Sequence, residues 1–189
     1  MIVAARIGTE MVVISPTVFW YPSGSVNQAI KIGILVILFA LAVRCTQQQK
    51  ATRVLVLKRE HKMELFAGES VIKTYAVAIG RGGLAPKQKQ GDHLTPEGSY
   101  QIDRRNKSSR FYRALHVSYP SEADRERARK DGVDPGGDIM IHGIRNGLGW
   151  LGSMHRMVDW TDGCIAVTDS EMDEIWDLVP DGTPVEIRP

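Results

Sequence analysis

The stretch that decides the fold is DIMIHG at residues 138–143, joined by a long connection to TDGCIAV at residues 161–167. Each part contains a short apolar run, which is typical of a buried strand. The connection over residues 143–160 is rich in glycine and aromatic residues, which favours a loop. We therefore predict two buried strands whose ends face one loop, with His142 closing the first strand and Cys164 at the start of the second.

Alternating and β-branched apolar residues predict further strands on both sides of this stretch. The expected strands are 53–58, 61–66, 71–79, 99–103, 114–119, 138–142, 163–167 and 183–188. One helix is expected over 121–130, and a second follows a capping box at residues 168–171 and ends before Pro180. Because strands predominate and two helices accompany them, the sequence predicts a β-rich α+β fold.

Composition narrows the possible functions. The chain has 189 residues, with 24 basic against 22 acidic side chains and two cysteines. This length fits one domain with little else. The balanced charge gives no strong positive field, so nucleic acid is not expected as a partner. Two cysteines are too few for a disulfide-rich scaffold.

The first quarter of the chain differs from the rest, because residues 32–43 form an uninterrupted apolar run. As a helix this run would span about 18 Å, short of the roughly 30 Å hydrocarbon core of a bilayer. With Lys31 in front of it, the segment 30–44 is most typical of the apolar core of an export signal. Two alternatives stay open, an uncleaved tilted membrane anchor and a buried core helix. We expect the segment to contact or cross the membrane during export, which would deliver the domain to the periplasm or another extracytoplasmic site.

The segments beside the apolar run are assigned separately. Residues 1–29 are an N-terminal extension, interpreted either as a cytoplasmic tail or as sequence upstream of a later start. Residues 45–52 are polar and are predicted to be a linker, and residues 53–189 are the folded domain. Cys45 follows Arg44, whereas lipidation signals have a small residue at that place, so lipidation is not favoured.

Cys164 stands where a turn enters a predicted strand, a placement that exposes a thiol on a rigid scaffold. A thiol needs a neighbouring base to become a nucleophile, and His142 is the candidate base. Backbone N–H groups around Gly163 are candidates for an oxyanion hole. The alternative interpretation is structural, with an inert core cysteine and a histidine near the surface.

Three motifs in this order resemble the catalytic signature of bacterial L,D-transpeptidases of the YkuD type. Along the chain they are TPEGSY at 95–100, Ile-His-Gly at 141–143 and Thr-Asp-Gly-Cys at 161–164. The resemblance covers about residues 52–189. It implies a mixed β-sheet sandwich or barrel with flanking helices.

The resemblance also implies a set of catalytic roles. Cys164 would be the nucleophile, His142 its base, and Gly143 the residue whose backbone carbonyl orients the imidazole. The partner would be a peptidoglycan stem tetrapeptide, which forms a thioester with Cys164 as D-alanine leaves. An amine of a neighbouring stem then takes the acyl group, which cross-links the cell wall. Neither a metal nor another cofactor is implied.

Two other classes of function stay open. In a hydrolytic relative, water takes the acyl group, giving an L,D-carboxypeptidase or a peptidoglycan amide hydrolase. In a non-catalytic wall-binding domain, Cys164 would be inert.

The motif departs from the family pattern at two positions. Position 162 is Asp where the family usually has His, and position 166 is Ala where Arg is frequent. We hypothesise that Asp159 and Asp162 bind the side-chain ammonium of diaminopimelate. Arg145 or Arg156 would then replace the missing carboxylate-binding arginine.

Other polar and aromatic residues of the domain are weaker candidates. His155 is a candidate for positioning substrate or for an alternative base, and Trp150 for stacking on a sugar. The spacings of His142, His155 and Cys164 match no short-spaced zinc motif, so no metal site is expected. A cluster of cations is either a patch for anionic polymers or an ordinary solvated surface. Its members are Arg104, Arg105, Lys107, Arg110 and Arg113.

Overall fold

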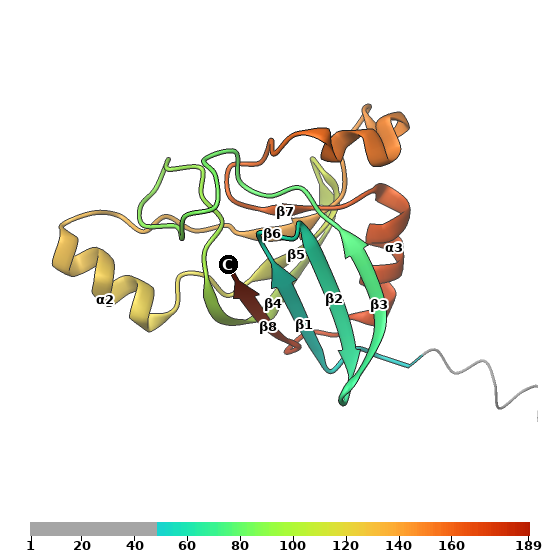
Figure 1. Ribbon diagram of the computed structural model, residues 1–189, viewed down its shortest axis with the longest axis horizontal. Helices are drawn as coiled ribbons and strands as arrows, with labels where there is room; N and C mark the ends of the chain where they lie inside the picture. Colours follow the sequence, from blue (N-terminus) through green and yellow to red (C-terminus); the bar gives the residue numbers. More distant parts are fainter. Residues whose placement is uncertain (1–48) are drawn as a thin grey trace, which may run out of the picture. The chain divides into compact units, whose positions relative to one another are not determined.

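The computed structural model describes residues 49–189, which form an eight-stranded mixed sheet with two α-helices and one 3₁₀ helix (Figure 1). The segments assigned to residues 1–29 and 30–44 lie outside the described residues, as do the first four residues of the linker, 45–48, which include Cys45. Within residues 49–189, no helix has both the length and the hydropathy that a bilayer span requires.

Four strands make up one half of the sheet. They are β1 (Arg53–Leu57), β2 (Lys62–Ala67), β3 (Ser70–Ala76) and β8 (Pro184–Arg188). The first three form an antiparallel meander, and β8 lies parallel to β1. Along β2, buried side chains alternate with more exposed ones, as the pleat of a strand with one covered face requires.

The other half of the sheet carries the motif residues. Its strands are β4 (Gly98–Ser109), β5 (Tyr112–Val117), β6 (Met140–His142) and β7 (Ile165–Ala166). β4 joins the two halves, because its first residues pair with β8 and its later residues pair with β5. β6 is antiparallel to β5, and β7 is parallel to β6. The strand order is therefore β3-β2-β1-β8-β4-β5-β6-β7.

The sheet folds over on itself without closing into a barrel. In the described chain, the segment after β3 meets the far edge only through isolated bridges, Ala78 with Ala166 and Gly80 with Thr161. Apolar side chains from both halves, such as Val56 and Ile141, share one core. Of the two architectures implied by the resemblance, the sandwich is the one observed.

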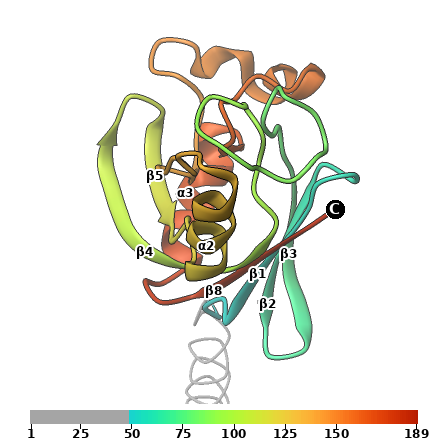
Figure 2. The ribbon, with the colours of Figure 1, turned by 90° about the vertical axis from the view of Figure 1, so that its left-hand side faces the viewer.

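The two helices differ in what they bury. α3 (Asp169–Leu178) packs Met172, Ile175 and Leu178 into the core, and Thr168 and Glu171 form the expected capping box. α2 (Glu122–Asp131) has few buried residues and projects from the side of the domain opposite α3 (Figures 1 and 2). α3 is therefore the helix that fixes the motif strands, through its contacts with β5.

Several elements differ from the sequence-based expectation. β3 ends at Ala76 and not at residue 79, and β6 begins at Met140 and not at residue 138. β7 covers only Ile165–Ala166, so Cys164 lies directly before the strand and not within it.

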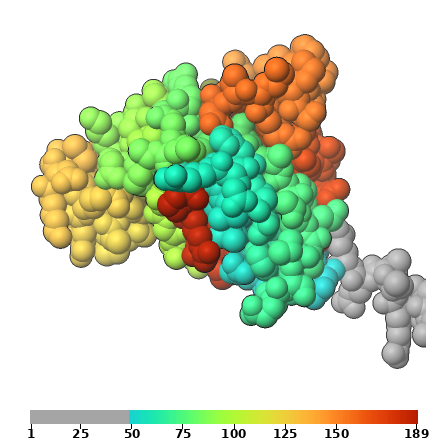
Figure 3. Space-filling view, in the orientation of Figure 1, coloured from blue at the N-terminus to red at the C-terminus, as the bar shows by residue number. Residues whose placement is uncertain are grey.

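β4 continues to Ser109 instead of ending at residue 103, because its polar second half pairs with β5 in a ribbon that leaves many of its side chains exposed. The predicted loop 143–160 contains the 3₁₀ helix η1 (Gly149–Met157), interrupted at Gly152, where φ is 50°. The segment around η1 forms a lobe that projects from one end of the domain (Figure 3).

Candidate active site

The neighbouring strands β6 and β7 bring His142 and Cys164 to one cavity. β6 and β7 are parallel, with His142 opposite Ala166. Cys164 directly precedes Ile165, the first residue of β7, which pairs with Ile141 of β6. Both residues line one cavity of about 900 Å³. The sequence-based pairing of these residues in one site therefore has a geometric basis.

The His142 imidazole is buried and held by one backbone oxygen. Its Nδ1 lies 2.7 Å from the carbonyl oxygen of Gly143, which fixes Nδ1 as the donor and leaves Nε2 as an acceptor. The Phe111 ring lies against it at 4.7 Å between centroids, and Trp160 approaches at 5.7 Å. Burial lowers the pKa of His142 to about 4, against the opposing effect of the Gly143 carbonyl, and the charge of His155 lowers it further. The imidazole is therefore neutral near pH 7.

Cys164 is a free cysteine, and its side chain is partly buried. Its Sγ lies 3.5 Å from the carbonyl oxygen of Asp138, to which the thiol donates. Burial raises the pKa of Cys164 to about 11, a hydrogen bond with the Met140 backbone opposes this, and the charge of Asp162 adds to the rise. The resting pair is thus a neutral thiol beside a neutral imidazole.

The turn before Cys164 accepts only glycine at position 163. Its φ is 124°, and a Cβ there would lie 2.6 Å from the carbonyl oxygen of Leu94. The Gly163 N–H, a predicted oxyanion donor, donates to Thr161 Oγ1 at 3.2 Å. The Thr161 hydroxyl in turn donates to the Cys164 carbonyl at 2.7 Å. Sequence reasoning did not single out Thr161, which fixes this turn with one hydroxyl.

The two acidic candidates occupy different environments. Asp162 lines the cavity, is exposed, and pairs with Arg81 at 2.9 Å and His93 at 2.8 Å. Asp159 lies outside the cavity lining, where its carboxylate accepts from the Ile79 N–H and pairs with His61, both at 2.9 Å. The structure brings only Asp162 of this pair to the cavity.

The two arginine candidates also differ in position, because only one of them lines the cavity. Arg145 lines the cavity. Arg156 lies outside its lining, because its guanidinium pairs with Glu171 at 3.0 Å and donates to the Ala76 carbonyl at 2.8 Å. Arg110, at the tip of the β4–β5 ribbon, lines the cavity instead. Its membership in the cationic cluster was the signal that could have identified it.

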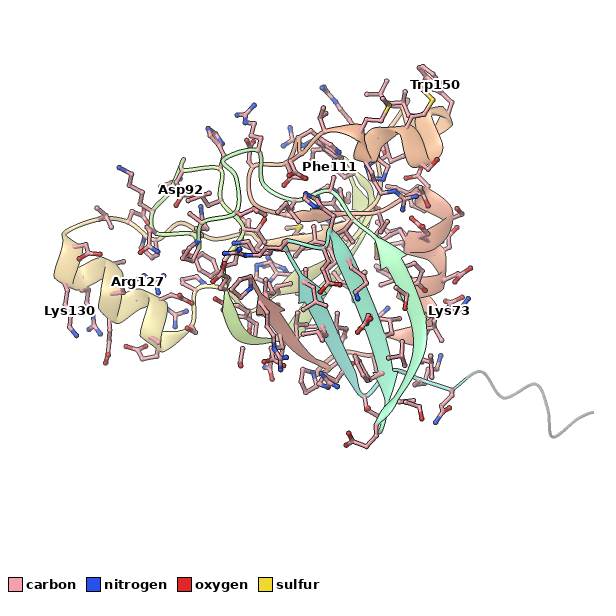
Figure 4. All side chains as sticks on the ribbon, viewed as in Figure 1. Lys73, Asp92, Phe111, Arg127, Lys130 and Trp150 are labelled. Carbon is pink, nitrogen blue, oxygen red and sulfur yellow. The ribbon has the colours of Figure 1, made fainter. Side chains whose placement is uncertain are left out.

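His155 and Trp150 lie on η1 but differ in burial. His155 lines the cavity, and its Nδ1 accepts from Trp160 Nε1 at 3.3 Å, while its buried Nε2 has no hydrogen-bond partner among the described residues. Trp150 is 76% exposed at the far end of the lobe, away from the cavity lining (Figure 4). Residues 49–189 contain no group of three or more His, Cys, Asp or Glu side chains arranged to hold a metal ion.

Comparison with known proteins defines the family. The L,D-transpeptidase catalytic domain (YkuD) matches residues 51–187. The Escherichia coli protein named "Putative L,D-transpeptidase YafK" is 31% identical over 130 residues, which cover 66% of this chain and 45% of that protein. The chain belongs to the L,D-transpeptidase (YkuD) family. It spans less than half the length of this curated relative.

Two solved structures share the fold. The helical cell shape determining protein Pgp2 from Campylobacter jejuni matches with a TM-score of 0.56 at 20% identity, covering 75% of this chain and 48% of that one. Bd1075 from Bdellovibrio bacteriovorus matches with a TM-score of 0.51 at 24% identity, covering 76% and 49%. At these identities the likeness shows the fold.

Proposed function

We propose that this domain is a cysteine-dependent L,D-transpeptidase that joins peptidoglycan stem peptides. The observation that carries the proposal is the arrangement of His142, whose Nδ1 donates to the Gly143 carbonyl, in the same cavity as Cys164. A histidine fixed in this way has its other nitrogen available to take a thiol proton. The family membership supports the same reaction class.

The proposed first step acylates Cys164. As Sγ attacks the carbonyl carbon of the third stem residue, His142 Nε2 takes the thiol proton. The C–N bond to D-alanine then breaks, the imidazolium returns its proton to the leaving amine, and D-alanine departs. In the second step an amine attacks the thioester, His142 takes the amine proton, and the sulfur leaves and is reprotonated.

The resting protonation states fit proton transfer during the attack. Because the pKa of the Cys164 thiol is raised and that of the His142 imidazole is lowered, a preformed thiolate–imidazolium pair is not the resting state. The proton therefore moves as the carbon–sulfur bond forms.

The charges that line the cavity support a zwitterionic substrate. Arg110 and Arg145 supply two guanidinium groups, and Asp138 and Asp162 supply two carboxylates. In this proposal, Asp162 contacts the ammonium of diaminopimelate, and the two arginines contact its carboxylate. His155 supplies an additional donor through its buried Nε2.

The outlying candidates take other roles in the proposal. Asp159 and Arg156 hold the scaffold through the intramolecular partners described above. Trp150 is exposed for stacking on a sugar of the glycan strand. Because peptidoglycan lies outside the cytoplasm, the proposal places the domain in the cell envelope, with segment 30–44 as export signal or anchor. A role in cell shape is consistent with the name of the structural neighbour Pgp2.

The test combines labelling with product analysis. A carbapenem or iodoacetamide should add its mass at Cys164 of the wild-type protein, located by peptide mass spectrometry so that labelling of Cys45 is told apart. The Cys164→Ser variant should lose that adduct. Incubation with a disaccharide-tetrapeptide should then give cross-linked dimers. Tripeptide without dimers would instead assign a hydrolytic L,D-carboxypeptidase. Absence of any adduct on the folded protein would favour a non-catalytic wall-binding domain.

A further inference from the structure

The peptide unit between Gly143 and Ile144 has a hydrogen-bond partner on each side. Its carbonyl oxygen accepts from His142 Nδ1 at 2.7 Å. Its N–H donates to the Asp169 carboxylate, with Oδ1 at 2.8 Å from the Ile144 nitrogen. An imidazole, a peptide and a carboxylate therefore form one continuous hydrogen-bonded chain.

Asp169 approaches the backbone of this loop unusually closely. A Cβ added at Gly143 would lie 2.6 Å from Asp169 Oδ1, and one added at Gly149 would lie 2.4 Å from Oδ2. Two glycines thus make room for a single carboxylate at the start of η1. The same contacts explain why only glycine fits at both positions.

The helix itself does not need Asp169 as its cap. Thr168 is the N-cap of α3, and its side chain and that of Glu171 complete the capping box. Asp169 also places a carboxylate in the first turn of α3, where it interacts favourably with the helix dipole. That interaction does not depend on which way the side chain points. The specific hydrogen bond of Asp169 to the Ile144 N–H is therefore not explained by helix capping.

We propose that Asp169 is a positioning residue for His142, acting through the Gly143–Ile144 peptide to hold the imidazole with Nε2 as the proton acceptor. A carboxylate on the peptide N–H polarises the peptide and increases the negative charge on its carbonyl oxygen. The hydrogen bond from Nδ1 to that oxygen then strengthens most when the imidazole becomes positively charged. The assignment of His142 as a base rests on the proposed function above.

The other groups around His142 do not supply this effect. Phe111 and Trp160 present rings, and the charge of His155 opposes protonation of the imidazole. Cys164 is neutral at rest because its pKa is raised. Asp169 is the carboxylate that reaches the imidazole through a hydrogen-bonded path within the described residues.

The test uses two variants and a matched control. Asp169→Asn keeps the shape and one side-chain oxygen but removes the charge, and Asp169→Ala removes the acceptor as well. Asp173→Asn is the control, because it removes the same charge one turn later on α3, where the side chain bonds the Tyr112 hydroxyl and Arg113. Thermal unfolding of each variant shows whether the fold persists.

Nitrogen NMR of the His142 imidazole is the main measurement, because a merely structural residue would not shift it. We expect Asp169→Asn to lower the His142 pKa and weaken the Nδ1–H signal, and Asp169→Ala to do both more strongly. Alkylation of Cys164 near pH 8 should slow about five-fold in Asp169→Asn. Asp173→Asn should leave the imidazole signals as in wild type.

The outcomes separate this inference from the proposed function. If the variants lower the melting temperature but leave the His142 signals unchanged, Asp169 has a structural role only and the inference is overturned. If the His142 signals respond but wild-type Cys164 does not react with either label, the positioning role stands and the proposed function fails.

Discussion

Gly143 lies between His142 and Asp169, with its carbonyl oxygen 2.7 Å from the His142 Nδ1 and its Cα too close to the Asp169 carboxylate for any side chain. This relationship predicts that Gly143→Ala will be harmful. The new Cβ would also lie 2.9 Å from the Tyr112 Cβ, so the loop must shift. We expect a loss of roughly 1–3 kcal/mol of stability and much slower Cys164 alkylation. Gly137→Ala, where no heavy atom lies within 4 Å of the new Cβ, is the control for thermal unfolding only, because Gly137 lines the cavity that holds Cys164. Equal thermal unfolding of the two variants would contradict this interpretation.

The thiol of Cys164 should react faster as the pH rises toward its pKa of about 11. Asp162→Asn removes a charge that disfavours the thiolate, so we expect alkylation at pH 8 to accelerate a few-fold. The same variant should weaken substrate binding if Asp162 contacts the substrate ammonium. The measurements are the iodoacetamide rate against pH and KM for the stem peptide. A rate that levels off below pH 7 would show a preformed thiolate and contradict the neutral resting pair.

His142 should make the domain less stable in mild acid. Its pKa is about 4 in the folded protein, below the ordinary value of 6.5, because it is buried. As the pH falls from 6.5 toward 4, the unfolded chain takes up a proton that the folded state does not, which costs up to about 3 kcal/mol. Thermal unfolding of His142→Gln should show a smaller loss over this pH window than wild type. Cys164→Ser keeps the imidazole and should retain the wild-type loss. An unchanged slope in His142→Gln would show that other groups cause the acid sensitivity.

Substitution of Arg145 should weaken substrate binding, whereas substitution of Arg156 should lower the stability of the fold. Arg145→Met removes a guanidinium from the cavity, so we expect KM to rise roughly ten-fold with little change in melting temperature. Arg156→Met leaves Glu171 without its guanidinium partner, so the melting temperature should fall while KM stays near wild type. Steady-state kinetics and thermal unfolding on the same preparations make the comparison. The reverse pattern would assign substrate binding to Arg156.

Arg110 should behave like Arg145, because it lines the same cavity from the β4–β5 ribbon. Arg110→Met is expected to raise KM several-fold. Lys107→Met, in the same cationic cluster but outside the cavity lining, is the matched control. If both variants lose binding equally, the cluster acts as a general anionic patch instead of a site-specific contact.

Several strands and the start of helix α3 follow from local patterns. Alternation and β-branching indicated β1, β2 and β3, and the capping box at Thr168 predicted the start of α3. The sequence did not predict the polar second half of β4, because a ribbon with many exposed side chains has no apolar periodicity. The sequence did not predict η1 either, because its glycines are typical of a loop.

The sequence by itself determined the order of the motif, the strand end that carries His142, and the family to which the chain belongs. These are local properties, set by residue type and spacing along a few neighbouring positions. The tertiary structure alone decided which charges reach the cavity. Asp159 and Arg156 are near the cysteine in sequence, but partners from the turn before β2, the segment after β3 and α3 hold them elsewhere. Asp169 and Arg110 reach the site from α3 and the β4–β5 ribbon, because a hydrogen bond depends on distance in space and not on separation along the chain.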